Sequence, residues 1–166
     1  PGTRPATLSR AASSGRGRSA CARPLRRLGS CGKIAIVTPS SVVVDASAAA
    51  AVLFREPDAL RVAPRLFRAS RAVVPQLFHL EVANIGRTKV RRREIDEVQA
   101  IALLASIDSW PLVVETVTWK DAWTAALSSG LTVYDAAYLH LTIRLRLPLL
   151  SLDAALIAAA GKRGRA

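Results

Sequence analysis

Short apolar runs alternate with longer stretches of helical spacing along residues 41–160 of this chain. Runs rich in valine and leucine at 42–44, 72–74, 112–117 and 147–152 predict strands. The stretches that follow them predict helices at 46–54, 58–69, 75–90, 94–107, 119–127, 132–144 and 153–160. Because these strands are apolar on both faces, helices must cover both sides of the sheet. The pattern therefore predicts an α/β fold, a three-layer sandwich around a parallel sheet of about four strands.

Single residues decide some of the expected boundaries and burials. Pro75 directly follows a predicted strand, and the first residue of a helix tolerates proline, so the next helix is expected to begin there. The tryptophans Trp110, Trp119 and Trp123 lie close together in sequence around one strand and one helix. For these rings we favour core packing over base stacking.

The positive charge is concentrated at the two ends of the chain. Of the 24 lysines and arginines, residues 1–40 hold eight without any acid, and residues 162–166 hold three. The net charge of +12 therefore leaves only +1 for the body of the chain. We expect a disordered basic extension at 1–40, a folded domain at 41–160 and a basic tail at 161–166.

Three interpretations of the extension stay open. Its arginines suit an arm that neutralises nucleic-acid phosphates, and its arginine- and serine-rich, acid-free composition suits a transit peptide. The third is translation upstream of the natural start, because the chain contains no methionine and a start near Val37 would leave 130 residues. Two cysteines are too few for a disulfide framework, and no apolar run reaches the roughly 18–20 residues of a membrane span, so we expect a cytoplasmic protein.

Four acidic residues are expected to meet at one edge of the sheet. Asp45 and Asp153 end the first and last predicted strands, and a helix follows each of them. Asp135 lies in the first turn of its predicted helix, and Glu81 lies in the second turn of the helix that begins at Pro75. The carboxyl ends of parallel strands share one edge, and ligands bind at that edge in open α/β sheets.

Each acid also has a purely structural interpretation. Asp45 and Asp153 suit helix N-caps. Asp135 resembles the last residue of a capping box, and Glu81 suits a solvated helix face. Capping does not require four acids on one rim, and two carboxylates about 4 Å apart repel by about 4 kcal/mol at an effective dielectric constant of about 20. Mg²⁺ or Mn²⁺ in an all-oxygen shell would compensate this repulsion, and such ions promote phosphodiester cleavage.

Four sequence blocks occur in a characteristic order. They are DAS from Asp45, E-x-x-N at Glu81 and Asn84, YDAAY around Asp135, and SLD ending at Asp153. Together, over residues 41–160, they resemble the PIN-domain ribonucleases of the VapC toxin type. The resemblance implies a PIN-like fold and a metal-dependent endoribonuclease that acts as the toxin of a toxin–antitoxin pair. Family members often continue into a last edge strand, whereas this chain passes from Ala160 into GKRGRA, so we expect that strand to be missing.

The resemblance also implies roles for single residues and for partners. The metal-binding acids would be Asp45, Glu81, Asp135 and Asp153, holding one or two Mg²⁺ or Mn²⁺ ions and orienting a water for attack on RNA. Ser47 and Ser151 would bind a ligand water or a phosphate, or make local turn bonds instead. Asn84 would orient Glu81 or make a buried hydrogen bond. The implied partners are RNA, a small antitoxin protein that inserts into the acidic groove, and a second copy of the chain.

Other features leave alternatives open. Five basic residues lie at and beyond the end of the Glu81 helix: Arg87, Lys89, Arg91, Arg92 and Arg93. They suit either a grip on the RNA backbone or a solvated helix end whose cations complement the helix dipole. A doubly wound phosphatase would carry a second aspartate two residues after Asp45, where this chain has Ser47. A non-catalytic RNA- or protein-binding module on the same fold remains the alternative to the enzyme.

Overall fold

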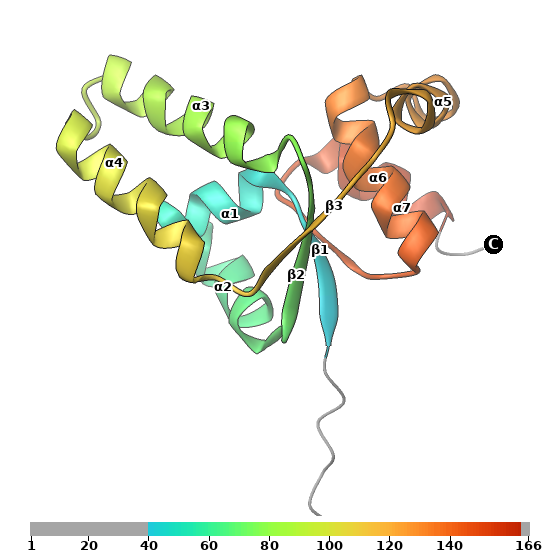
Figure 1. The fold of residues 1–166 in the computed structure, drawn as a ribbon, viewed down its shortest axis with the longest axis horizontal. Helices are drawn as coiled ribbons and strands as arrows, with labels where there is room; N and C mark the ends of the chain where they lie inside the picture. Colours follow the sequence, from blue (N-terminus) through green and yellow to red (C-terminus); the bar gives the residue numbers. More distant parts are fainter. Residues whose placement is uncertain (1–39, 164–166) are drawn as a thin grey trace, which may run out of the picture. The chain divides into compact units, whose positions relative to one another are not determined.

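The computed structural model describes residues 40–163, so nearly all of the predicted extension and residues 164–166 lie outside the described part of the chain. Within this part, four strands form one sheet in the order β3-β2-β1-β4 (Figure 1). They are β1 (Ser41–Val44), β2 (Arg71–Pro75), β3 (Leu112–Glu115) and β4 (Leu149–Leu150). Every neighbouring pair is parallel, which confirms the predicted sheet.

Helices cover both faces of this sheet and make the predicted three-layer sandwich (Figure 1). One side carries α1 (Ala46–Leu53), α2 (Ala59–Arg68), α3 (Phe78–Arg91) and α4 (Glu97–Ser106), and the short 3-10 helix η1 (Ile107–Ser109) follows α4. The other side carries α5 (Trp119–Ser129), α6 (Val133–Leu145) and α7 (Ala154–Arg163). Because the sheet is parallel, the helices that directly follow strands, α1, α3, α5 and α7, all start on the side of its carboxyl edge.

The core is built around β1 and the alanine-rich helix α1. Val43 and Val44 are 0% exposed, and α1 buries six of its eight residues. Five of these six are alanines, whose small side chains allow close packing against the neighbouring elements. Tyr138 of α6 and Phe78 of α3 are the largest fully buried side chains. Core packing therefore fixes the backbone that carries Asp45, which caps α1.

The structure differs from the prediction at Pro75. This residue ends β2 and pairs with Glu115 of β3, and α3 begins three residues later, at Phe78. The fixed φ of proline suits the end of a strand as well as the start of a helix, so the residue alone does not distinguish the two. The difference matters because it puts Glu81 in the first turn of α3 rather than in the second.

Other helix and strand boundaries also differ from the predicted ones. α4 begins at Glu97 instead of residue 94, because the side chains of Asp96 and Gln99 form a reciprocal capping box. β4 has two residues where 147–152 were predicted. α7 continues to Arg163, so the first residues of the predicted tail are helical. No helix within residues 40–163 is long and apolar enough to cross a membrane.

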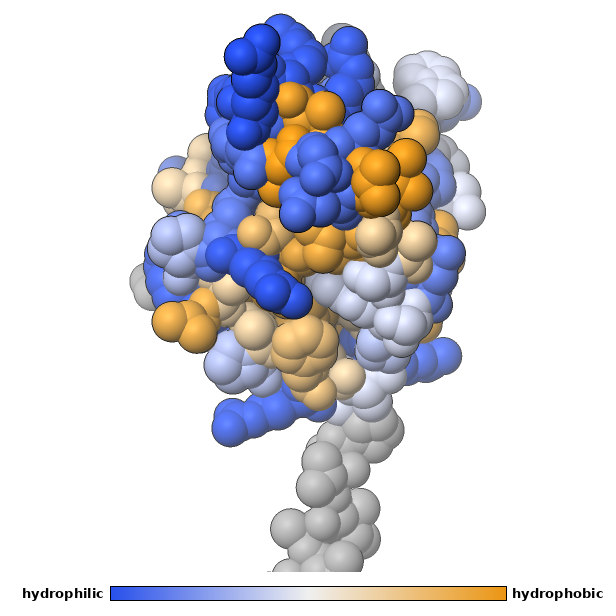
Figure 2. Space-filling model, turned by 90° about the vertical axis from the view of Figure 1, so that its left-hand side faces the viewer, coloured by the Kyte–Doolittle hydropathy of each residue, from blue (hydrophilic) through white to orange (hydrophobic). Residues whose placement is uncertain are grey.

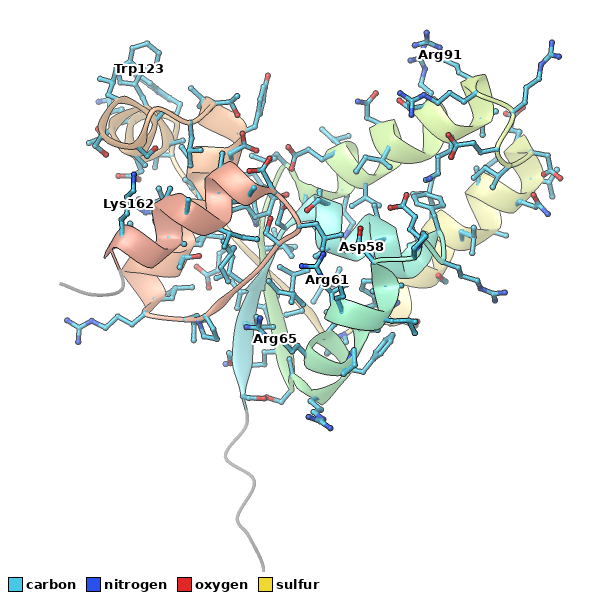
Figure 3. The ribbon with its side chains drawn as sticks, turned by 180° about the vertical axis from the view of Figure 1, so that it is seen from behind. Asp58, Arg61, Arg65, Arg91, Trp123 and Lys162 are labelled. Carbon is cyan, nitrogen blue, oxygen red and sulfur yellow. The ribbon has the colours of Figure 1, made fainter. Side chains whose placement is uncertain are left out.

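The expectation of buried tryptophans is wrong for two of the three. Trp119 is 72% exposed and Trp123 is 53% exposed, and Figure 3 shows Trp123 pointing away from the body of the molecule. Alanines, not aromatic rings, form the buried face of α5. Trp110 alone is half-buried, and its ring lies edge-on to Phe67 with 6.2 Å between the centroids.

The outer side of the α3–α4 pair combines charged and apolar side chains. α4 exposes Val98 (78%) and Ile101 (60%), which lie three residues apart and so on the same helix face. Figure 2 looks at this side of the molecule and shows apolar patches bordered by hydrophilic residues. The buried contacts of α4 come from other positions, among them Ala100.

At Gly86, α3 lies close to Phe54 and Leu104, and replacing this glycine tests how tightly they pack. A Cβ at this position would lie 3.1 Å from the ring of Phe54 and 3.4 Å from Leu104. We therefore expect Gly86→Val to lower the free energy of unfolding by about 1–3 kcal/mol, the usual cost of overpacking. Urea denaturation followed by circular dichroism measures this loss. Gly161→Ala is the control, since a Cβ there meets nothing within 4 Å.

Candidate active site

The four acids predicted to converge come from four elements at the carboxyl edge of the sheet. Asp45 directly follows β1 and caps α1. Glu81 and Asp135 lie in the first turns of α3 and α6. Asp153 follows β4 and precedes α7. The starts of α1, α3 and α6 lie on the same side of the sheet, where the strands point (Figure 1).

Asp45 is the most enclosed of the four acids, with only 6% of its surface exposed. Its Oδ2 accepts hydrogen bonds from the hydroxyls of Ser47 and Ser151, the latter at 2.8 Å, and from the backbone N–H of Ser47 at 3.3 Å. Burial raises the pKa of the Asp45 carboxyl above its usual value, and these hydrogen bonds act in the opposite direction. All of these bonds end on Oδ2, so none of them occupies Oδ1.

The two serines join the loops that carry the first and last acids. The backbone N–H of Leu152 donates to Oγ of Ser47 at 3.0 Å, and the N–H of Asp153 donates to Oγ of Ser151 at 2.9 Å. Each hydroxyl in turn donates to Asp45. The serine contacts therefore fix the β4–α7 loop, with Asp153 on it, against the start of α1.

Glu81 is half-buried, and the negative charges of two other acids act on it. The hydroxyl of Tyr138 donates a hydrogen bond to Oε2 of Glu81. Burial raises the pKa of Glu81, the hydrogen bond from Tyr138 lowers it, and the negative charges of Asp45 and Asp135 raise it further. Asp45 and Asp135 therefore both lie close enough to Glu81 for their charges to repel its carboxylate.

The capping interpretation also holds for Asp45 and Asp153, whereas Asp135 is bonded to Thr132, the residue that caps its helix. Oδ2 of Asp135 accepts a 2.6 Å hydrogen bond from the hydroxyl of Thr132, which accepts the N–H of Asp135 in return. Oδ1 of Asp153 accepts the N–H of Leu156 at 2.7 Å. In Asp135 and in Asp153 these bonds use one carboxylate oxygen and not the other.

The acids suit a divalent metal ion by their chemistry rather than by their present spacing. Carboxylate oxygens are the donors that Mg²⁺ and Mn²⁺ prefer, and the mutual repulsion at Glu81 is what such an ion would relieve. Among residues 40–163, however, no three His, Cys, Asp or Glu side chains are close enough together to hold an ion. The acids share an edge without forming a coordination sphere, so binding an ion requires their side chains to close around it.

Among the other polar residues, the structure places Asn84 differently from the expectation that it orients Glu81 or makes a buried hydrogen bond. Asn84 is exposed, and no hydrogen bond joins its side chain to Glu81 in the described part of the chain. Its backbone carbonyl accepts a hydrogen bond from the hydroxyl of Thr88 at 2.9 Å. His79 is exposed and lies against the ring of Phe78. His140 is half-buried with an unpartnered Nε2, so neither histidine joins the acids.

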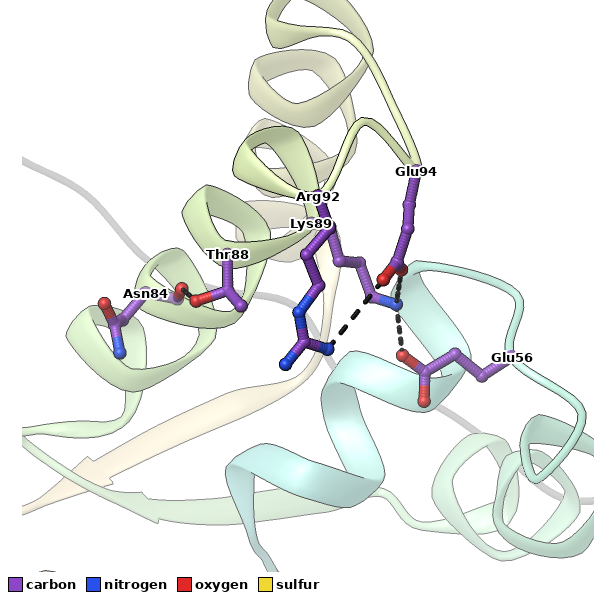
Figure 4. A network of polar contacts seen from close by, with 6 residues as sticks. All are labelled: Glu56, Asn84, Thr88, Lys89, Arg92 and Glu94. Carbon is purple, nitrogen blue, oxygen red and sulfur yellow. Dashed lines mark hydrogen bonds and ion pairs between the residues drawn. The ribbon is translucent and has the colours of Figure 1, made fainter.

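The basic cluster at the end of α3 divides into two kinds of residue. The ammonium of Lys89 binds Glu56 at 2.6 Å and Glu94 at 3.0 Å (Figure 4), and it lies 5.6 Å from the centroid of the Phe54 ring. Only 16% of the Lys89 side chain is exposed. Arg92 reaches Glu94 at 3.9 Å.

The remaining arginines of this cluster face the solvent. Arg87, Arg91 and Arg93 are exposed and make no ion pair within residues 40–163. Figure 3 shows Arg91 at the end of α3, pointing away from the body. Arg91 lies ten residues after Glu81, about 15 Å along the helix axis at about 1.5 Å per residue.

The sequence favours a packing role for Tyr138, and the structure adds a polar contact with Glu81. The spacing of three residues from Asp135 places both on one face of α6, and that spacing was visible in the sequence. The sequence did not show that the hydroxyl meets Glu81 of another helix.

Comparisons with known proteins agree on one family. The model of the PIN domain family matches residues 42–162. The chain is 33% identical over 116 residues to ribonuclease VapC3 of Pyrobaculum aerophilum, which covers 68% of this chain and 88% of that protein. Its fold resembles that of PAE2754 from the same organism, with a TM-score of 0.60 and 24% identity over 76% of this chain and 82% of the other. VapC20 of Mycobacterium tuberculosis, described as a toxin that cleaves the sarcin–ricin loop, matches with a TM-score of 0.56 and 20% identity over 71% and 94% of the two chains.

Proposed function

The chain belongs to the PIN domain family, and we propose that it is a metal-dependent endoribonuclease that acts as the toxin of a VapBC-type toxin–antitoxin pair. The observation that carries the proposal is the placement of carboxylates from three separate elements at one edge of the sheet, where burial and then the charges of Asp45 and Asp135 raise the pKa of Glu81. Like charges held this close destabilise the folded state, and a bound cation would offset that cost. Carboxylates perturbed in this way are typical of functional sites. The relative named ribonuclease VapC3 supports RNA as the substrate class.

The four acids would hold Mg²⁺ or Mn²⁺ through the oxygens that their hydrogen bonds leave open. When bound, the ion would lower the pKa of a water and stabilise negative charge on the phosphate. Asp45 is held by Ser47 and Ser151, so its Oδ1 keeps a fixed direction. The hydroxyl of Thr132 holds the carboxylate of Asp135, and the N–H of Leu156 holds that of Asp153.

Partners follow from the same proposal. A small antitoxin would neutralise the enzyme by inserting a segment at the acidic edge, and a second copy of the chain would complete a homodimer. Action on cellular RNA would place the protein in the cytoplasm.

Cleavage of RNA by the purified chain in Mg²⁺ tests the activity, and sequencing the new 5′ ends identifies the RNA that is cut. Intact RNA after incubation with excess folded protein and Mg²⁺ or Mn²⁺ would favour the non-catalytic binding module instead.

A matched pair of substitutions separates the two roles in the basic cluster. Arg91→Gln is expected to weaken RNA binding several-fold, most strongly at low salt, because an exposed arginine contributes through phosphate contacts that salt screens. Lys89→Met should leave RNA affinity unchanged and lower stability by about 1 kcal/mol through its lost ion pairs, a small value because the partners are partly solvated. Filter binding at two salt concentrations and urea denaturation measure the two effects. Equal loss of RNA affinity in both variants would contradict this division.

A further inference from the structure

Tyr138 lies beneath the acidic edge and contacts Glu81 directly. Its side chain is 0% exposed, and its hydroxyl donates a hydrogen bond to Oε2 of Glu81. The hydroxyl also lies close enough to Asp45 for that carboxylate to raise the pKa of Tyr138. Burial and the neighbouring carboxylates raise the pKa of Tyr138, so the hydroxyl keeps its proton and remains a donor. The hydroxyl therefore lies where α6, α3 and the start of α1 meet.

Glu81 needs a restraint of this kind more than the other acids do. Asp45, Asp135 and Asp153 have short side chains, and each is tied to groups near its own backbone by caps or serine contacts. Glu81 has a longer side chain, and the charges of Asp45 and Asp135 repel it. Without a hydrogen-bond donor to hold it, the Glu81 carboxylate would lower its electrostatic energy by turning toward water, which screens these charges.

We propose that Tyr138 is a positioning residue that holds one carboxylate oxygen of Glu81, so that Oε1 stays directed toward the ion that the four acids would share. The inference rests on the proposed function. Restraining Glu81 during folding means that less side-chain freedom is lost when the ion binds. The hydroxyl thereby acts on the metal affinity through Glu81 and touches neither the RNA nor the reacting atoms.

Tyr138→Phe keeps the ring in the core and removes only the hydroxyl. We expect it to weaken Mn²⁺ binding about 10- to 100-fold, the range typical when a group that orients a metal ligand is lost. Isothermal titration calorimetry of the full chain measures this affinity without RNA. At saturating Mn²⁺ the cleavage rate should recover to within a few-fold of the unsubstituted chain, which a general loss of structure would not allow.

Tyr134→Phe is the matched control. Tyr134 lies on the same helix, is 65% exposed, and makes no hydrogen bond through its hydroxyl in the described part of the chain. It should bind Mn²⁺ as the unsubstituted chain does. Equal Mn²⁺ affinity in Tyr138→Phe and Tyr134→Phe would overturn the inference.

A double substitution tests whether Tyr138 acts through Glu81. In a Glu81→Gln background, Tyr138→Phe should cause no further loss of Mn²⁺ affinity. A full additional loss would show that the tyrosine acts elsewhere and would overturn the inference. Failure of the unsubstituted chain to bind Mn²⁺ would instead refute the proposed function, so the two failures are distinguishable.

One measurement needs no variant and remains available if Tyr138→Phe does not fold. The buried hydroxyl proton of Tyr138 should give a protected NMR signal in the unsubstituted chain. With diamagnetic Mg²⁺ added to saturation, the signal should persist, because the tyrosine is expected to keep its hold on Glu81 while the ion binds. Its disappearance on Mg²⁺ binding would mean that Glu81 leaves the tyrosine and would overturn the inference.

Discussion

Asp45→Asn is expected to reduce RNA cleavage at least about 100-fold while leaving the chain folded. A metal-bound nuclease site supplies several kcal/mol of transition-state stabilisation, and losing about 3 kcal/mol of it corresponds to about 100-fold in rate. Asparagine keeps the size of the side chain and can still accept bonds from Ser47 and Ser151, but it removes a carboxylate that is 6% exposed. Cleavage of RNA in Mg²⁺, measured at several protein concentrations, gives the rate.

The fold should tolerate this substitution well. Burial raises the pKa of Asp45, so at neutral pH its ionised form costs stability in the folded state, and the uncharged amide removes that cost. We expect the unfolding midpoint without metal to stay the same or to rise. Asp108→Asn is the matched control, because Asp108 is exposed and precedes β3, at the opposite end of the strand from the acids. A fully active Asp45→Asn protein would contradict the site.

Removing divalent cations is expected to stop cleavage altogether, and restoring Mg²⁺ or Mn²⁺ should recover it. The same ions should stabilise the fold, because a ligand that binds only the folded chain adds RT ln(1 + [L]/Kd), about 1.4 kcal/mol at ten times Kd. For a domain of this size this corresponds to a rise of roughly 5 °C in Tm. Differential scanning calorimetry with EDTA and with Mn²⁺ measures the rise.

Asp45→Asn protein provides the reference for the calorimetric experiment. It should show little or no rise in Tm at the same Mn²⁺ concentration, because the ion loses a charged ligand. Cleavage that continues in EDTA would reject the metal mechanism while leaving the family assignment untouched.

The sequence alone predicted the larger features of the fold. The valine runs and the helical spacing gave four parallel strands and helices on both faces, because burial on two sides leaves a clear apolar pattern. The predicted helix and strand boundaries were wrong where one residue suits two conformations, as at Pro75, or where a better helix cap lies further along the chain, as at Asp96. The predicted burial was wrong for Trp119 and Trp123, because apolar character alone does not show which face of α5 packs against the core.

For the site, the sequence predicted which acids come together better than how they are arranged. The end of a strand and the start of the helix that follows it share the carboxyl edge of a parallel sheet, so topology places Asp45 and Glu81 on one edge. Asp135 lies on α6, which follows α5 rather than a strand, so topology alone does not place it there. Contacts between side chains of different helices have no signal in one sequence. The hydrogen bond from Tyr138 to Glu81 is of that kind.

The shortness of β4 has a consequence for how the site opens over time. The amide of Asp45 is bonded to the carbonyl of Leu150 at 2.9 Å, so the shortest strand of the sheet holds the backbone of the most buried acid. An edge strand of two residues is the element most prone to transient local opening. Hydrogen–deuterium exchange should show the amides of Asp45, Leu152 and Asp153 exchanging together and faster than those of β2. Such an opening would release both serine contacts at once, and so would briefly dismantle the site while the rest of the sheet stays intact.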